Sequence, residues 1–103
     1  MANTFKNAGV AIGTSRTTLY TAPSNTQSVI HALYISNIDG VNDANVTVDG
    51  GTTYRHICKT VPVPADATLL MDKPINLEAG DILGLTASVA GDLEVFASVL
   101  EIA

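Results

Sequence analysis

The sequence predicts an all-β protein, an antiparallel β-sandwich of jelly-roll-like form with roughly eight short strands. Short apolar runs alternate with clusters of turn-forming residues along the chain, which is the spacing typical of sandwiches. The apolar residues are mainly Ala, Val, Ile and Leu, and they are accompanied by many Thr, a mixture that pleated sheets favour. No stretch has a convincing helical period.

Length and composition set the class of protein. A chain of 103 residues predicts one domain over residues 1–103, in which residues 1–8 form an N-terminal arm. With 47% hydrophobic and 15% charged residues, the chain is too apolar to be disordered. A net charge of −5 argues against a nucleic-acid partner. No apolar run approaches the roughly 20 residues of a membrane span, and the N-terminus lacks the apolar segment of a secretory signal, so we expect folding in a reducing cytoplasm without a membrane partner.

The first 27 residues predict two short strands and two turns. A strand is expected near Val10 and Ile12, followed by a turn at residues 13–15. Residues 16–21 (RTTLYT) are rich in Thr and Tyr and predict a second strand. Residues 22–27 (APSNTQ) are dense in turn formers and predict a loop.

Residues 28–37 (SVIHALYISN) form the strongest predicted strand of the first half. Strict alternation places Val29, His31, Leu33 and Ile35 on one face, and Ile30, Ala32 and Tyr34 on the other. A strand that is apolar on both faces is expected to be buried on both. One face should meet the second sheet, so the other should meet a loop, the arm or another subunit.

A β-hairpin follows. Residues 45–49 and 53–60 predict its two strands, and Asp49-Gly50-Gly51 predicts the turn because Asp-Gly pairs accept positive φ angles. In the second strand, alternation places Tyr54, His56 and Cys58 on one face, and Arg55, Ile57 and Lys59 on the other.

Residues 61–88 predict two strands whose ends are marked by turn residues. Pro62, Pro64 and Pro74 lack backbone N–H donors, so they fit at strand starts and sheet edges. A short apolar run lies between them, in ADATLLMDK. The LEAGD turn then places Gly80 where positive φ is needed and Asp81 where its carboxylate can bond nearby backbone, before a strand resumes at Ile82.

The chain closes with a strand over residues 93–102 (LEVFASVLEI), after a turn at residues 89–92. Alternation places Leu93, Val95, Ala97 and Val99 on one face, and Phe96, Leu100 and Ile102 on the other. We therefore expect a central strand that ties the C-terminus into a sheet.

No residue pattern predicts catalysis, a cofactor or a metal site. His31 and His56 are the only histidines, and Cys58 is the only cysteine, so no internal disulfide forms. His56 and Cys58 share a strand face, but zinc needs three or four converging ligands, and neighbours two apart on a strand point outward side by side rather than at each other as a nucleophile pair would.

Acidic residues likewise predict turns rather than sites. The loop with Asp39, Asn42 and Asp43, together with Asp49, lacks the ligand spacing of an EF-hand, so a solvated loop is expected instead of a calcium site. Glu78 and Asp81 flank a turn and are interpreted as part of it rather than as an acid–base pair.

Three segments resemble a protein family: TTLYTAPSNTQSVIHALYISNIDG, VTVDGGTTYRHICKTVPVPADATLLMDKPINLEAGDIL and ASVAGDLEVFASVLEI. They are similar to small structural proteins encoded by tailed bacteriophages, particularly phages of aquatic bacteria. The similarity covers nearly the whole chain but is one of overall pattern, so it implies a role and no active site. It implies a virion component: a capsid decoration protein, or a piece of neck, tail or fibre.

The hypothesis drawn from the sequence is a non-enzymatic decoration (cement) protein of a phage capsid, located in the virion after assembly in the host cytoplasm. Its expected partners are the major capsid protein or other virion proteins, and copies of itself, with a trimer favoured. The residues expected to contact a subunit or the capsid are Ile30, Tyr34, Phe96, Leu100 and Ile102. Two alternatives remain open: a receptor- or carbohydrate-binding module of a tail or fibre, and a metal-dependent enzyme on a cupin-like barrel, for which the sequence lacks a ligand cluster.

Overall fold

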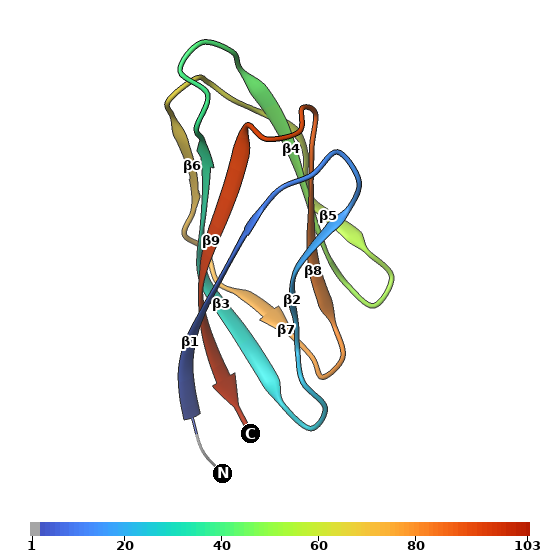
Figure 1. Ribbon diagram of the computed structural model, residues 1–103. Helices are drawn as coiled ribbons and strands as arrows, with labels where there is room; N and C mark the ends of the chain where they lie inside the picture. Colours follow the sequence, from blue (N-terminus) through green and yellow to red (C-terminus); the bar gives the residue numbers. More distant parts are fainter. Residues whose placement is uncertain (1–2) are drawn as a thin grey trace.

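The structure, a computed structural model, describes residues 3–103 as nine β-strands in two antiparallel sheets that pack face to face (Figure 1). The strands are β1 (Asn3–Ala11), β2 (Thr17–Thr21), β3 (Gln27–Asn37), β4 (Ala44–Gly51), β5 (Arg55–Val63), β6 (Thr68–Met71), β7 (Ile75–Leu77), β8 (Ile82–Ala87) and β9 (Leu93–Ile102). The predicted all-β antiparallel sandwich is confirmed. The strand count exceeds the expected eight because the short segment β7 pairs with β3. No helix in the described part of the chain is long and apolar enough to cross a membrane.

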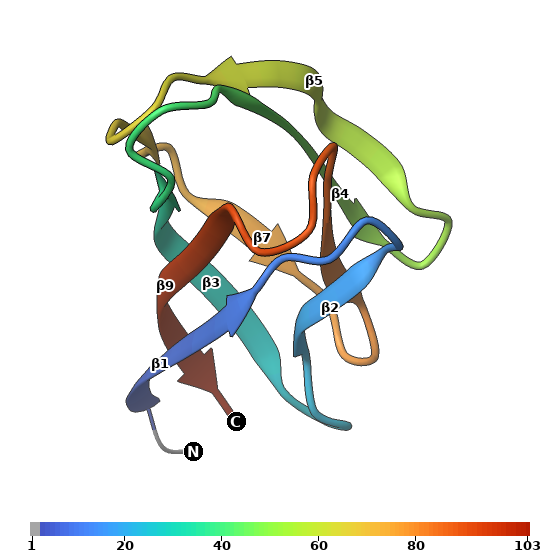
Figure 2. The same ribbon diagram turned by 45° about the horizontal axis from the view of Figure 1, so that its top comes forward.

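The chain passes repeatedly between the two sheets. Sheet 1 has the order β1-β9-β3-β6, and β7 also pairs with β3; sheet 2 has the order β2-β8-β4-β5. Strand β9 therefore lies between β1 and β3, although it follows every other strand in the sequence. Figure 2 shows the two layers in a tilted view, with β9, β3 and β1 on one side of the sandwich and β5, β4 and β2 on the other.

The core lies between the sheets and is built from alternate residues of their central strands. As predicted, Leu93, Val95, Ala97 and Val99 of β9 are all buried. They face buried residues of sheet 2, among them Leu83 and Leu85 of β8 and Val46 and Val48 of β4. Aliphatic side chains of this size pack densely and account for most of the favourable free energy of folding.

The predicted faces of β3 are wrong in its first half, because the strand contains a β-bulge. Ile30 pairs with Val99 and Ala32 pairs with Ser98, so His31 is an extra residue without an opposite partner. The bulge turns Ile30 into the core beside Leu33 and leaves His31 exposed. The two-sided burial expected for this strand is therefore replaced by a buried inner face and a partly exposed outer face.

The predicted hairpin between β4 and β5 is confirmed, but its turn lies three residues later than expected. Residues 52–54 form the turn, in which Tyr54 has a φ of 56°, and Gly51 before it has a φ of 90°. The turn is displaced because β4 also pairs with β8, and that pairing continues through Gly50 and Gly51 to Ile82. Pairing with β8 thus keeps the Asp-Gly-Gly segment within β4.

Prolines and the LEAGD turn lie where the sequence predicts. Pro62 is in β5, which is an edge strand of sheet 2, and Pro64 and Pro74 lie just after β5 and just before β7. Gly80 has a φ of 86°. The Asp81 carboxylate accepts a hydrogen bond from the Glu78 N–H at 2.9 Å, which closes the turn.

The described part of the expected N-terminal arm is strand. Residues 3–8 belong to β1, which pairs with β9 in unbroken register from Asn3 opposite Ile102 to Ala11 opposite Glu94. Residues 1 and 2 of the expected arm lie outside the described residues.

Candidate binding surface

The outer face of sheet 1, the face turned away from sheet 2, carries four of the five contact residues expected from the sequence. Phe96, Leu100 and Ile102 alternate along β9 with buried residues, so their side chains point outward. Tyr34 lies on the same face in β3. Ile30 does not, because the bulge in β3 buries it completely; it is therefore left out of the surface proposed below.

An apolar row crosses this face from edge to edge. The pairing registers place Gly9, Phe96, Tyr34 and Leu70 side by side on β1, β9, β3 and β6. Phe96 is 48% exposed, Tyr34 41% and Leu70 51%. The Tyr34 and Phe96 rings lie 6.4 Å apart between centroids and are tilted by 49°, a favourable arrangement for an aromatic pair.

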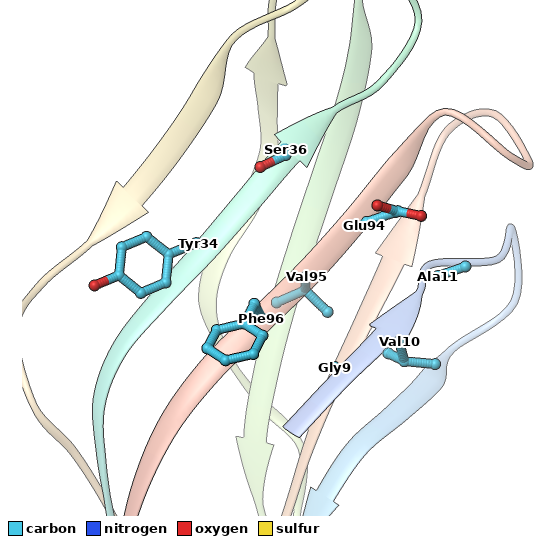
Figure 3. A pocket seen from close by; sticks show the side chains of 8 residues that line it. All are labelled: Gly9, Val10, Ala11, Tyr34, Ser36, Glu94, Val95 and Phe96. Carbon is cyan, nitrogen blue, oxygen red and sulfur yellow. The ribbon is translucent and has the colours of Figure 1, made fainter. Parts of the chain in front are cut away.

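A shallow hollow of about 370 Å³ lies beside this row, with the two aromatic rings at its rim and no side chain at Gly9 (Figure 3). Its lining residues are Gly9, Val10, Ala11, Tyr34, Ser36, Glu94, Val95 and Phe96. Glu94 and Ser36 are opposite one another, one step along the strands from the aromatic pair. The hollow thus combines an apolar surface with a carboxylate and a hydroxyl, which suits an apolar or aromatic side chain with a polar neighbour.

A second hollow of about 310 Å³ lies on the other side of Phe96. It is lined by Phe5, Lys6, Asn7, His31, Phe96, Ser98 and Val99. Phe5 is 79% exposed, which is unusual for a large aromatic side chain. Reasoning from the sequence missed Phe5 and Leu70 as members of this surface, because their place beside Phe96 and Tyr34 follows only from strand order and register.

Sheet 2 carries a different cluster around Arg16, which precedes β2. The Arg16 Nε donates to the Asp49 carboxylate at 2.6 Å, and the guanidinium carbon lies 3.7 Å from the centre of the Tyr54 ring. A Cβ atom on Gly84 would be 2.5 Å from Arg16 Cζ, so the guanidinium lies directly against the backbone of Gly84. The guanidinium is therefore held between the backbone of β8 and the hairpin turn, and it joins three segments of the chain.

A polar cluster between the sheets surrounds Glu101. The Tyr20 hydroxyl donates a short hydrogen bond to Glu101 and also lies 2.8 Å from the Ser28 hydroxyl, while Lys6 Nζ is 3.2 Å from Glu101. The hydrogen bond from Tyr20, and then Lys6, lower the pKa of the Glu101 carboxyl. Burial and the bond to Glu101 raise the pKa of Tyr20. These groups satisfy one another and connect β1, β2, β3 and β9, so their arrangement is structural.

The fold does not bring a set of metal ligands together within the described residues. His31 lies on sheet 1 and His56 on sheet 2. Within residues 3–103, no group of three or more His, Cys, Asp or Glu side chains is placed to hold a metal ion. Burial raises the pKa of the Cys58 thiol, which makes it a poorer nucleophile.

The acidic loop is organised by backbone hydrogen bonds. Asp39 accepts from the N–H groups of Val41 and Asn42 at 2.8 and 3.1 Å, and these bonds lower the pKa of its carboxyl. Asp43 accepts from the Ala65 N–H at 3.1 Å. Asp49 is held by Arg16, so the carboxylates serve separate partners rather than one site.

Comparison with known proteins gives a likeness of fold. No family model and no curated protein matches this chain. The structure is similar to a chain of the acidic stable capsid structure of Helicobacter pylori bacteriophage KHP30, with a TM-score of 0.56 and 10% identity over 100% of this chain and 89% of that one. It is equally similar to a chain of the Bacillus endospore appendages that form disulfide-linked pili, with a TM-score of 0.56 and 10% identity over 99% and 87% of the two chains. A chain of the infectious bursal disease virus structure, Gx strain, has a TM-score of 0.46 and 15% identity over 97% of this chain and 29% of that one.

Proposed function

We propose that this protein is a non-enzymatic structural component of a bacteriophage virion. Its lead role is that of a capsid decoration protein, which stabilises the head by bridging subunits of the major capsid protein. The sequence resemblance to phage structural proteins supports this role, and so does the likeness of fold to a chain of a phage capsid structure. The strand orders β1-β9-β3-β6 and β2-β8-β4-β5 support the description of the sandwich as a jelly roll, a fold that capsid proteins use.

The observation that carries the proposal is the exposed apolar row on the outer face of sheet 1. Phe96, Tyr34 and Leu70 lie side by side there, and each is at least two-fifths exposed. Contiguous exposed apolar surface of this kind marks interaction sites in soluble proteins. The few residues that dominate an interface are enriched in aromatic residues near its centre, and truncating one of them costs about 2 kcal/mol or more of binding free energy, so this row is suited to be the anchor of a capsid contact.

Copy number tests the role. We expect hundreds of copies per purified particle, measured against the major capsid protein, and oligomers of which the trimer is favoured. A dozen copies or fewer would place the protein in the neck, tail or fibres, where few symmetric positions exist. Its absence from the particle would refute a virion role.

A matched pair of variants tests the surface. In sedimentation with particles that lack the protein, F96S should abolish binding. V41S should leave binding unchanged, because Val41 is 83% exposed but lies in the loop before β4 rather than on the outer face of sheet 1. If F96S binds as well as the natural protein, the capsid contact lies elsewhere.

The second candidate is a receptor- or carbohydrate-binding module of a tail or fibre. It is favoured by one observation, the placement of two exposed aromatic rings beside the Glu94 carboxylate and the Ser36 hydroxyl in the larger hollow. Sugars stack on aromatic faces while their hydroxyls bond to such groups. Glycan-array binding that is lost in Y34A would support this candidate, and silence on the array would remove it.

A further inference from the structure

The four edges of the two sheets differ in how they are protected from further pairing. Edge strand β5 contains Pro62 and two register shifts, and edge strand β2 is five residues long with a shift of its own. On the far side of sheet 1, β6 and β7 have four and three residues. Short strands, bulges and prolines are the devices with which native sheets block edge-to-edge association.

Strand β1 is neither short, bulged nor interrupted by proline, and its one protective feature is the charge of Lys6, which is paired with Glu101. It is nine residues long, contains no proline, and pairs with β9 without a register shift. Lys6 is its one charged residue. A long regular edge of this kind is a template for another strand.

The direction of the free hydrogen-bonding groups follows from the pairing with β9. The Ile12 N–H, at the end of β1, donates to the Leu93 oxygen at 2.9 Å. Because antiparallel strands alternate between residues that bond to a given neighbour and residues that bond away from it, even-numbered residues of β1 bond to β9. The five odd-numbered residues, from Asn3 to Ala11, therefore direct their N–H and C=O groups to the open edge.

We propose that this edge pairs with β1 of a second copy of the chain, antiparallel, about a two-fold axis at Asn7. Asn7 is the middle residue of the strand, so this register uses all nine residues. It places Asn3 opposite Ala11 of the second copy, Phe5 opposite Gly9 and Asn7 opposite Asn7. The five outward-directed residues of one copy then pair with the five of the other. The two five-stranded sheets become one continuous sheet.

Side-chain shape supports this register. Phe5 is the most exposed aromatic residue of the described chain, and Gly9 lies on the same face of β1. Gly9 has no side chain to cover the 370 Å³ hollow beside Phe96. In the proposed pairing, the Phe5 ring of each copy lies across Gly9 of the other and enters that hollow, an arrangement in which a cross-strand aromatic residue covers a glycine. Each copy supplies one ring and one hollow, so the contact is made twice.

Charge also favours a second copy as the occupant. Lys6 is neutralised by Glu101 of its own chain at 3.2 Å and stands opposite Ala8 of the second copy in this register. Strand β1 therefore contributes no carboxylate and no uncompensated cation to the contact, although the whole chain carries a net charge of −5. The Glu94 carboxylate is part of the contact only as one of the residues that line the hollow. Nine residues a side is fewer than the roughly 20–30 of a stable interface, so we expect a dimer that dissociates on dilution.

This contact does not depend on the proposed function. By itself it produces a dimer with two-fold symmetry. If the chain also forms a trimer, the contact joins two trimers into a hexamer.

Native mass spectrometry and sedimentation equilibrium over a dilution series test the proposal. We expect species with even copy numbers for the natural protein. N7P should abolish them, because the proline removes an outward-directed N–H and leaves the bonds to β9 intact. The matched control N7T should retain them, because threonine keeps the N–H and favours strands.

F5A and G9V provide a second test that does not use proline. Both should shift the equilibrium at least tenfold toward the dissociated form, F5A by removing the ring and G9V by filling the hollow. Circular dichroism melting confirms that each variant is folded. A strictly monomeric or strictly trimeric natural protein would overturn the proposal, and so would full association of F5A and G9V. The proposed function is tested separately, by measuring the binding of N7P to particles.

Discussion

Substitution of Gly84 by alanine tests how the Arg16 cluster holds the hairpin. Gly84 lies in β8 with ordinary extended backbone, so alanine introduces no backbone strain. Its Cβ atom would lie 2.5 Å from Arg16 Cζ and 2.7 Å from Nε. Contacts of that length do not occur, so the guanidinium must leave its place between Gly84 and the Tyr54 ring.

The expected cost follows from what Arg16 loses. Its ion pair with Asp49 has a distance of 2.6 Å, and the side chains are only 26% and 9% exposed. A hydrogen bond to a charged group contributes about 1.5–3 kcal/mol, and the contact with the Tyr54 ring adds about 0.5–1 kcal/mol. Alanine in a strand regains about 0.5–1 kcal/mol of backbone entropy relative to glycine. The net loss of stability is therefore about 1–3 kcal/mol, and each kcal/mol lowers the Tm of a domain this size by about 4–8 °C.

A double-mutant cycle measured by thermal and urea unfolding isolates the cause. G84A should be destabilising in the natural chain and neutral or slightly stabilising in the R16A background, where nothing occupies the space above residue 84. Equal destabilisation in both backgrounds would show that the loss comes from β8 itself and would refute this account.

Three further outcomes are expected. Replacing the fully buried Leu33 by alanine should reduce stability in urea by about 2–5 kcal/mol, whereas V41A in the exposed loop should change it by less than about 0.5 kcal/mol. G80A should lower the Tm by an amount equal to about 1–2 kcal/mol, because alanine is strained at a φ of 86°, and an unchanged Tm would contradict the turn geometry. Because the pKa of Glu101 is lowered in the folded state, its contribution to stability is full above the ordinary value of 4.5 and disappears as pH falls through the folded-state pKa. Acid titration followed by circular dichroism should therefore show that the stability of E101Q depends less on pH below 4.5 than the stability of the natural chain does.

The sequence predicts the fold well where local chemistry decides it. The alternation from Leu93 to Ile102 specifies both faces of β9, and the LEAGD turn requires the positive φ of Gly80 that the structure has. Pro62 correctly marks an edge strand. These signals come from side-chain periodicity and from residues with restricted or unusual backbone preferences, so they are visible without tertiary information.

The remaining features depend on neighbouring strands. The bulge at His31 adds one residue to β3, and strict alternation cannot show which residue is extra. Gly50 and Gly51 stay in β4 because β8 bonds to them. Residues 3–8 are largely polar yet form a strand because β9 offers them a partner.

The sequence reveals only some of the residues that lie on the outer face of sheet 1, for the same reason. Phe96 and Tyr34 could be assigned to outer faces from alternation, but Ile30 was assigned to the wrong side of the bulge. Phe5 and Leu70 join the surface through pairings of β1 with β9 and of β6 with β3, which no local pattern contains.

The central position of β9 determines the order in which this protein can fold. Its register joins Asn3 to Ile102 and Gln27 to Ile102, so sheet 1 closes only through contacts between opposite ends of the sequence. Closing such long loops costs chain entropy before any contact is gained, which slows folding to the range of milliseconds to seconds. During synthesis β1 has no partner strand, and β3 is unpaired along one side, until β9 has left the ribosome. Until then the apolar inner surfaces of both sheets stay open to other chains, and at high expression levels aggregation competes with closure of the sandwich.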